Sequence, residues 1–193
     1  MGKLVVTEFI SVDGVVEDPG GAEGFEHGGW SMQFNRGEEG DAFKTEELMA
    51  SDAQLLGRTT YQGFAQAWPS MAEMGGFAAR MNTMPKYVVS TTLTDAEATW
   101  ENSKVIRGDL SEQVSSVKAA FPGDVLVAGS ATLVRALAER DLVDEYRLMV
   151  FPLVLGSGKR VFAEGTRMTR LRLVDTKPVG PDGVVVLTYQ PQR

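Results

Sequence analysis

The sequence predicts an α/β protein with a mostly parallel central sheet, antiparallel strands at its C-terminal edge and helices on both faces. Apolar, β-branched segments alternate with amphipathic segments over most of the chain, which is typical of parallel strands joined by helices. The last part holds two strand-like segments around the turn sequence GPDG, which indicates an antiparallel pair. Because 193 residues without a linker or repeat are enough for one substantial core, we expect a single domain over residues 1–193.

The elements of the N-terminal half follow from short-range patterns. KLVVTEFI at residues 3–10 is apolar and β-branched, as in a central strand. Residues 11–40 are rich in glycine and predict a long loop, and loops of this length in compact domains are usually functional or mobile. The patterns then predict a helix within 38–51, a strand at 50–57, a helix at 58–68, a short helix within 74–86 ended by Pro85, and strands at 86–90 and 104–107.

The C-terminal half begins with a clear helix start. Asp109 as N-cap, with Glu112 three residues later, is a variant of the capping box and predicts a helix over 109–121. The run YRLMVFPLVLG is too apolar and too long to face water, so we expect a largely buried strand over 145–155. The other predicted elements are a strand at 124–129, a helix at 130–141 and two strands within 170–190.

Composition excludes several classes of function. A formal net charge of −7 argues against a nucleic-acid or anionic-membrane partner, because such binding rests on Lys and Arg. The chain has no cysteine and only one histidine, His27, so we expect no metal site and no cysteine nucleophile. It has no apolar run long enough to cross a bilayer and no signal-peptide pattern at its N-terminus, so we expect a cytoplasmic protein.

Three strand ends carry hydroxyl side chains. The segments LLG-RTTYQGF and VLVAG-SATLVRAL each run from an apolar strand through glycine and hydroxyl-bearing residues into a helix, and VVS-TTL again places hydroxyls after a strand. In a parallel sheet these junctions lie at the carboxyl edge, where ligand sites form. Glycine permits close approach of the backbone, helix N-termini attract anions, and Arg58 adds a permanent cation suited to phosphate.

The same residues have a structural interpretation. Ser and Thr are preferred N-caps, and each junction taken alone is more often simple capping. Three such junctions together, one of them with an arginine, favour a dinucleotide ligand.

Taken in order, the segments resemble the dihydrofolate reductase-like fold, and within it the branch of the RibD C-terminal domain, the reductase domain of riboflavin biosynthesis. The similar segments are SVDG after the first strand, LLGRTTYQGF, KYVVST, and the stretch from VAGSATLVRAL through LVDE to LGSGKRVF. They cover nearly the whole chain.

The resemblance implies an NADPH site. Gly57, Arg58 and Thr59 or Thr60 would contact the cofactor phosphates. A 2′-phosphate would depend on Arg58, because Thr132 stands where folate reductases often have a basic residue. The other cofactor residues that the resemblance implies are Ser90 and Thr91 on the adenosine side, Gly129, Ser130, Ala131 and Thr132 at the pyrophosphate, and Asp13 and Gly14 beside the nicotinamide.

Fewer residues suggest where a substrate binds. Asp41 lies near the expected start of the first helix, where it could face a substrate or be a solvated capping carboxylate. Asp13 could orient substrate or relay a proton, although an Asp before Gly is also a common turn former. The loop at residues 13–30 could be a lid that packs Trp30 over the cleft, or a surface insertion that Trp30 anchors.

We therefore expect an NADPH-dependent reductase that transfers hydride to a small pterin- or pyrimidine-like ring, or to a carbonyl or imine. The resemblance suggests activity similar to the 5-amino-6-(5-phosphoribosylamino)uracil or dihydrofolate reductases, and pairing into a homodimer. The alternative is a non-catalytic nucleotide-binding or structural protein that keeps the reductase fold.

Overall fold

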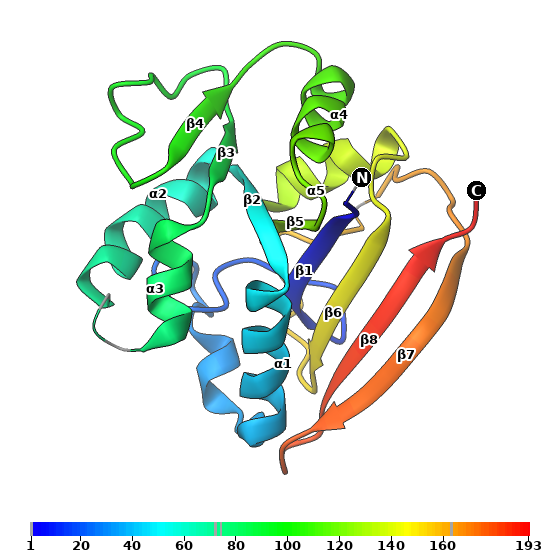
Figure 1. Ribbon diagram of the computed structural model, residues 1–193. Coiled ribbons are helices and arrows are strands. Elements are labelled where there is room, and N and C mark those ends of the chain that lie inside the picture. The colour runs from blue at the N-terminus through cyan, green and yellow to red at the C-terminus, as the bar shows by residue number, and fades with distance from the viewer. Residues whose placement is uncertain (1, 72, 74, 163) are drawn as a thin grey trace.

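The computed structural model describes residues 2–71, 73, 75–162 and 164–193 (Figure 1). In these residues the chain forms one eight-stranded sheet in the order β4-β3-β2-β5-β1-β6-β8-β7. The predicted α/β class and antiparallel C-terminal edge are confirmed, because the pairs from β4 to β6 are parallel and only the pairs β6–β8 and β8–β7 are antiparallel. The elements are β1 (Leu4–Ser11), η1 (Trp30–Gln33), α1 (Gly37–Met49), β2 (Ser51–Gly57), α2 (Arg58–Ala67), η2 (Trp68–Met71), α3 (Gly76–Thr83), β3 (Lys86–Val89), β4 (Ser103–Ile106), α4 (Leu110–Ala120), β5 (Asp124–Val127), α5 (Ala131–Glu139), β6 (Glu145–Phe151), β7 (Leu171–Val179) and β8 (Val184–Pro191).

The central strand β1 has partners of different lengths on its two sides. Its pairing with β5 ends at Val6, which lies opposite Val127. Its pairing with β6 continues to Ser11, opposite Phe151. The C-terminal half of β1 therefore has a strand neighbour only on the β6 side, and the sheet opens between β1 and β5.

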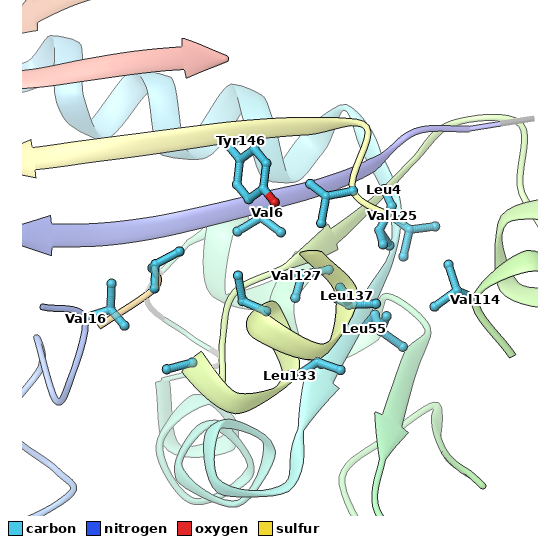
Figure 2. Packing of buried hydrophobic residues seen from close by; sticks show 14 of the residues in the cluster. Leu4, Val6, Val16, Leu55, Val114, Val125, Val127, Leu133, Leu137 and Tyr146 are labelled. Carbon is cyan, nitrogen blue, oxygen red and sulfur yellow. The ribbon is translucent and has the colours of Figure 1, made fainter. Parts of the chain in front are cut away.

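Helices cover both faces of the sheet, as predicted. Leu4 and Val6 of β1 face α4 and α5 and pack with Leu133 and Leu137 of α5 (Figure 2). Val5, which points the opposite way, belongs to a second cluster with residues of α1, α2 and α3. This alternation explains why the parallel strands read as continuous apolar runs, since both faces are buried.

A third hydrophobic cluster holds the C-terminal end of the loop between β1 and α1. Trp30 of η1 is fully buried and packs edge-on against Phe151 of β6, with ring centroids 5.5 Å apart. Val179, Val184 and Val186 of the C-terminal hairpin complete the cluster. The loop between β1 and α1 is therefore fixed to the sheet at its C-terminal end.

One predicted element ends earlier than expected. The strand predicted over 145–155 stops at Phe151, because Pro152 lacks the amide N–H that the next ladder bond needs. The expected burial of the run holds as far as Phe151 and is wrong beyond it, where Val154 is 71% exposed. The capping prediction is confirmed: Asp109 Oδ1 accepts a 3.0 Å hydrogen bond from the amide of Glu112.

Within the described ranges, no helix is long and apolar enough to cross a membrane. The same residues contain no group of three or more His, Cys, Asp or Glu side chains that could hold a metal ion.

Candidate functional site

The junctions after β2 and β5 meet at the carboxyl edge of the sheet. The amide of Gly57 donates to the carbonyl oxygen of Gly129 over 3.3 Å. A Cβ atom on Gly57 would lie 2.4 Å from Ser130 Oγ, and one on Gly129 would lie 2.7 Å from Thr60 Oγ1. The Gly129-Ser130 peptide bond is cis, and Gly129 has a φ of +99°. The fold thus brings together Gly57, Thr60, Gly129 and Ser130 from distant parts of the chain, with no room for larger side chains at the glycines.

Two helix N-termini open onto this edge without side-chain caps. The N-cap of α2 is Gly57, and the N-cap of α5, Ser130, makes no capping hydrogen bond with its hydroxyl. The first amide groups of α2, including Thr59, and of α5, including Thr132, therefore keep donors that the helices themselves do not satisfy. Because each helix start carries partial positive charge, the arrangement suits an anion such as a phosphate.

Arg58, the first residue of α2, reaches toward the end of β3. Its Nη1 donates to Thr92 Oγ1 over 2.6 Å. In the turn that follows β3, Ser90 Oγ accepts a hydrogen bond from the amide of Leu93 at 2.9 Å, and Thr91 is exposed. The β2–α2 junction and the turn after β3 are therefore in direct contact.

A small cavity of about 50 Å³ lies beside this turn, and Ser90, Thr91 and Arg107 are among its lining residues. Arg107 follows β4 directly, and its Nη2 donates to the carbonyl oxygen of Leu93 at 2.6 Å. Sequence reasoning missed Arg107. The same signal that indicated Arg58, a basic residue at the carboxyl end of a strand, could have found it.

Asp13 lies at the turn after β1 and is held by the chain around it. Its carboxylate accepts hydrogen bonds from Ser11 Oγ at 2.7 Å and from the amides of Leu155 and Gly156 at 3.1 and 2.9 Å. Burial raises the pKa of Asp13, but these hydrogen bonds lower it more, to about 2. The side chain is therefore an ionised carboxylate at neutral pH. The neighbouring Gly14 completes the turn with a φ of +84°.

Trp30 and Asp41, the two residues predicted to lie at the substrate pocket, differ in their exposure to solvent. Trp30 is inside the third core cluster, and its Nε1 donates to the carbonyl oxygen of Glu17 at 2.8 Å. Asp41 lies on α1 with its side chain 66% exposed and accepts a 2.6 Å hydrogen bond from Arg36 Nε.

A polar cluster between β1 and α1 was also missed by sequence reasoning. Thr7 Oγ1 donates to Glu47 Oε2 at 2.8 Å, and Lys44 Nζ donates to both, at 2.6 and 2.5 Å. The cations of Arg36 and Lys44 lie 5.1 and 5.5 Å from the centre of the Phe9 ring. A threonine inside the apolar strand at residues 3–10 was the available signal, because a polar side chain there needs a partner.

Two known proteins are similar to the chain in sequence. The uncharacterized proteins YyaP and YwjB of Bacillus subtilis (strain 168) are 25% and 27% identical to the chain over 190 and 178 residues, which cover 97% and 92% of it. The matches span 94% and 92% of those proteins. The chain and these relatives therefore correspond over almost their full lengths.

Solved structures show the same fold. A Shewanella sp. PV-4 protein whose name connects it with riboflavin biosynthesis is 20% identical, with a TM-score of 0.77 and 99% of both chains covered. Dihydrofolate reductase from Enterococcus faecalis, solved in complex with NADP(H), is 16% identical, with a TM-score of 0.61, 100% of this chain and 98% of that chain covered. The model of the RibD C-terminal domain matches residues 2–185. The chain belongs to the RibD C-terminal domain family.

Proposed function

We propose that the protein is an NADPH-dependent reductase that transfers hydride to a small pterin- or pyrimidine-like ring, or to a carbonyl or imine. The observation that carries this proposal is the meeting of two uncapped helix N-termini over the close contact of Gly57 with Gly129 and Ser130. The glycines let the two junctions pack closely, which brings the free amide donors of both helix N-termini together and fits a pyrophosphate. Membership of a reductase-type family supports the same assignment.

The chain's own residues would bind and orient the cofactor. The amides that start α2 and α5, with Thr59, Thr60, Ser130, Ala131 and Thr132, would hold the pyrophosphate, while Arg58, Ser90 and Thr91 would hold the adenosine side. When bound, reduced nicotinamide supplies the hydride. We assign Asp13 to orientation at the nicotinamide end, since its low pKa keeps the carboxylate ionised and tied to the 155–156 backbone. Its neighbour Gly14 would let the cofactor approach the turn.

The substrate would enter between β1 and α1. Phe9 offers an aromatic face there, and Arg36 and Lys44 place positive charge beside it. Trp30 would support the wall of this pocket, because it packs with Phe151 in the core cluster behind it. Asp41 would lie at the rim of the pocket. We further propose that the reaction takes place in the cytoplasm without a nucleic-acid or membrane partner, in keeping with the net charge of −7.

Nucleotide titration tests the proposal. Nicotinamide fluorescence should show saturable binding of NADPH by the wild-type chain. Gly57→Ala should weaken binding at least tenfold, about 1.4 kcal/mol, because the new Cβ displaces Ser130. Gly63→Ala on the same helix is the matched control, since a Cβ there meets nothing within 4 Å. Failure of both NADPH and NADH to bind would contradict the proposal. Binding without turnover of any ring, carbonyl or imine substrate would support the alternative of a non-catalytic nucleotide-binding protein.

Arg58→Ala should weaken NADPH much more than NADH. A charge-assisted hydrogen bond to the 2′-phosphate contributes about 1.5–3 kcal/mol, so the NADPH dissociation constant should rise by roughly ten- to 150-fold. Separate titrations of the two nucleotides measure this difference, and Arg140→Ala at the far end of α5 is the control. Equal losses for both nucleotides would mean that Arg58 acts through its hydrogen bond to Thr92 instead.

We also propose that the chain forms a homodimer through its C-terminal edge. The edge strand β7 exposes Leu173 and Val174, at 49% and 47%, and pairs with no other strand of the described residues on its outer side. Analytical ultracentrifugation should show twice the chain mass of 20.9 kDa, and Leu173→Asp should shift the protein to the monomer. Met32→Asp, at an exposed apolar residue on η1, should not do so. A wild-type protein that is monomeric at micromolar concentration would contradict the dimer.

A further inference from the structure

The segment LGSGKR, residues 155–160 of the loop after β6, lies against the turn that follows β1. Val15 and Arg160 form an isolated antiparallel bridge between the two segments. Next to this bridge, the amide of Val161 donates to the carbonyl oxygen of Gly14 at 3.2 Å. The turn after β1 is therefore built jointly by two parts of the chain that are far apart in sequence.

The side chain of Arg160 ties this turn to the loop. Its Nε donates to the carbonyl oxygen of Asp13 at 2.9 Å. Its Nη2 donates to Asp13 Oδ2 at 3.3 Å and to the carbonyl oxygen of Gly156 at 3.2 Å. Because the planar guanidinium presents its donors in fixed directions, contacts to two acceptors of Asp13 fix where that residue lies. The side chain of Arg160 is 38% exposed, so these contacts are made at the surface of the site.

Arg160 is itself held by the helix that starts at the proposed pyrophosphate site. Arg135 on α5 donates from Nε and Nη2 to the carbonyl oxygen of Arg160, at 3.0 and 2.7 Å. Arg135 lies about one helical turn after Ala131, the first residue of α5. A continuous line of hydrogen bonds therefore runs from the first turns of α5 through Arg135 and Arg160 to Asp13.

The loop amides are already used by the protein. Glycine-rich segments followed by a basic residue often bind phosphate through their amide groups. In this loop the amides of Leu155 and Gly156 donate instead to the carboxylate of Asp13, at 3.1 and 2.9 Å. The loop thus binds a carboxylate of its own chain, and its contribution to the site is the fixed placement of the turn at Asp13 and Gly14.

We propose that Arg160 is a positioning residue for the nicotinamide half of the cofactor and that Arg135 connects it to the pyrophosphate half. This inference rests on the proposed function, which places Asp13 and Gly14 at the nicotinamide end. With Arg160 in place, the turn is ordered before the ring arrives. Without it, part of the binding free energy is spent on ordering the turn. Arg160 does not touch the cofactor in this arrangement, so its effect is confined to the part of the cofactor that meets the turn.

The test compares two ligands, NADPH and 2′-phospho-ADP-ribose, which lacks the nicotinamide ring and keeps the adenosine, the 2′-phosphate and the pyrophosphate. Calorimetry measures both dissociation constants. Arg160→Gln should raise the constant for NADPH about tenfold, as expected for the loss of a charge-assisted hydrogen bond, and leave that for 2′-phospho-ADP-ribose unchanged. Arg160→Lys keeps a cation that can donate to Asp13, so it should recover part of the loss. Arg167→Gln, at a 69% exposed arginine that pairs with Asp141, is the matched control and should change neither constant.

A double variant tests the connection through Arg135. Arg135→Gln should also weaken NADPH selectively, and the combination with Arg160→Gln should lose no more than Arg160→Gln alone, because both changes release the same turn. Losses that add would overturn this connection.

The two ligands also separate failure of this inference from failure of the proposed function. Equal weakening of both ligands by Arg160→Gln would mean that Arg160 only maintains the fold, and would overturn its positioning role. If Arg160→Gln does not fold, Arg160→Lys carries the same comparison, with an expected difference of about threefold. A wild-type chain that binds both ligands equally tightly would also overturn the role, since the ring would then make no contact. The absence of saturable binding of either ligand would instead overturn the proposed function.

Discussion

Replacing Trp30 by alanine is expected to lower the free energy of unfolding by about 3–5 kcal/mol. The indole is fully buried, packs edge-on against Phe151 and donates its N–H to the carbonyl oxygen of Glu17 at 2.8 Å. Alanine removes this packing, leaves a cavity and deprives a partly buried carbonyl of its donor. Chemical denaturation, analysed as a two-state transition, measures the change.

Met32→Ala is the control for Trp30, because Met32 lies in the same short helix and is 79% exposed. It should change stability by less than about 0.5 kcal/mol. A loss below about 1 kcal/mol for Trp30→Ala would contradict the role of Trp30 as an anchor of the loop. It would favour the other interpretation, a lid over the cleft, which predicts weaker substrate binding with little change in stability.

Replacing Glu47 by alanine is expected to destabilise the protein by a similar amount, about 3–5 kcal/mol, because it leaves the largely buried Lys44 without its counter-charge and removes one of the three carboxylates around Arg147. Glu47 Oε2 accepts hydrogen bonds from Thr7 and Lys44, and Arg147 Nη1 lies 3.6 Å from Oε1. The side chains of Lys44 and Arg147 are both 17% exposed, so water can only partly replace the lost carboxylate.

The matched control is Glu46→Ala, one residue earlier on α1 and exposed to solvent. It makes the same chemical change on the same helix and should cost less than about 1 kcal/mol. If the two variants were equally stable, the cluster around Thr7 would not be an important part of the fold. Glu47→Gln distinguishes charge from shape, since the amide keeps an acceptor for Lys44 and loses the charge.

The fold was predictable because its patterns are local. The strand at residues 3–10, the helix after Arg58 and the helix that Asp109 caps all appear where apolar periodicity and capping residues predict them. The early end of β6 is the exception. The apolar residues continue past Pro152, so the hydrophobic pattern predicted a longer strand. Pro152 has no amide donor, and the strand ends before it.

The site was predictable only where it depends on junctions between strand and helix. The convergence of Gly57 and Gly129 follows from β2 and β5 being neighbours in a parallel sheet. The partners of Glu47 and Lys86 could not be read in the same way, because they depend on packing between segments far apart in the chain. Lys86 is fully buried at the start of β3, and its Nζ donates to the carbonyl oxygens of Asn82, Met84 and Glu101. Sequence patterns place a lysine at a strand end in solvent, and nothing local indicates three carbonyls around it.

The contact between Gly57 and Ser130 makes two distant positions share one small volume. With 2.4 Å between Ser130 Oγ and the place of a Cβ on residue 57, neither side chain can grow unless the other shrinks or moves. Substitutions at the two positions should therefore be non-additive, and a change that is harmful alone becomes tolerable with a compensating one. Mutant libraries that aim to alter nucleotide preference should vary positions 57 and 130 together, as a single unit of the sequence.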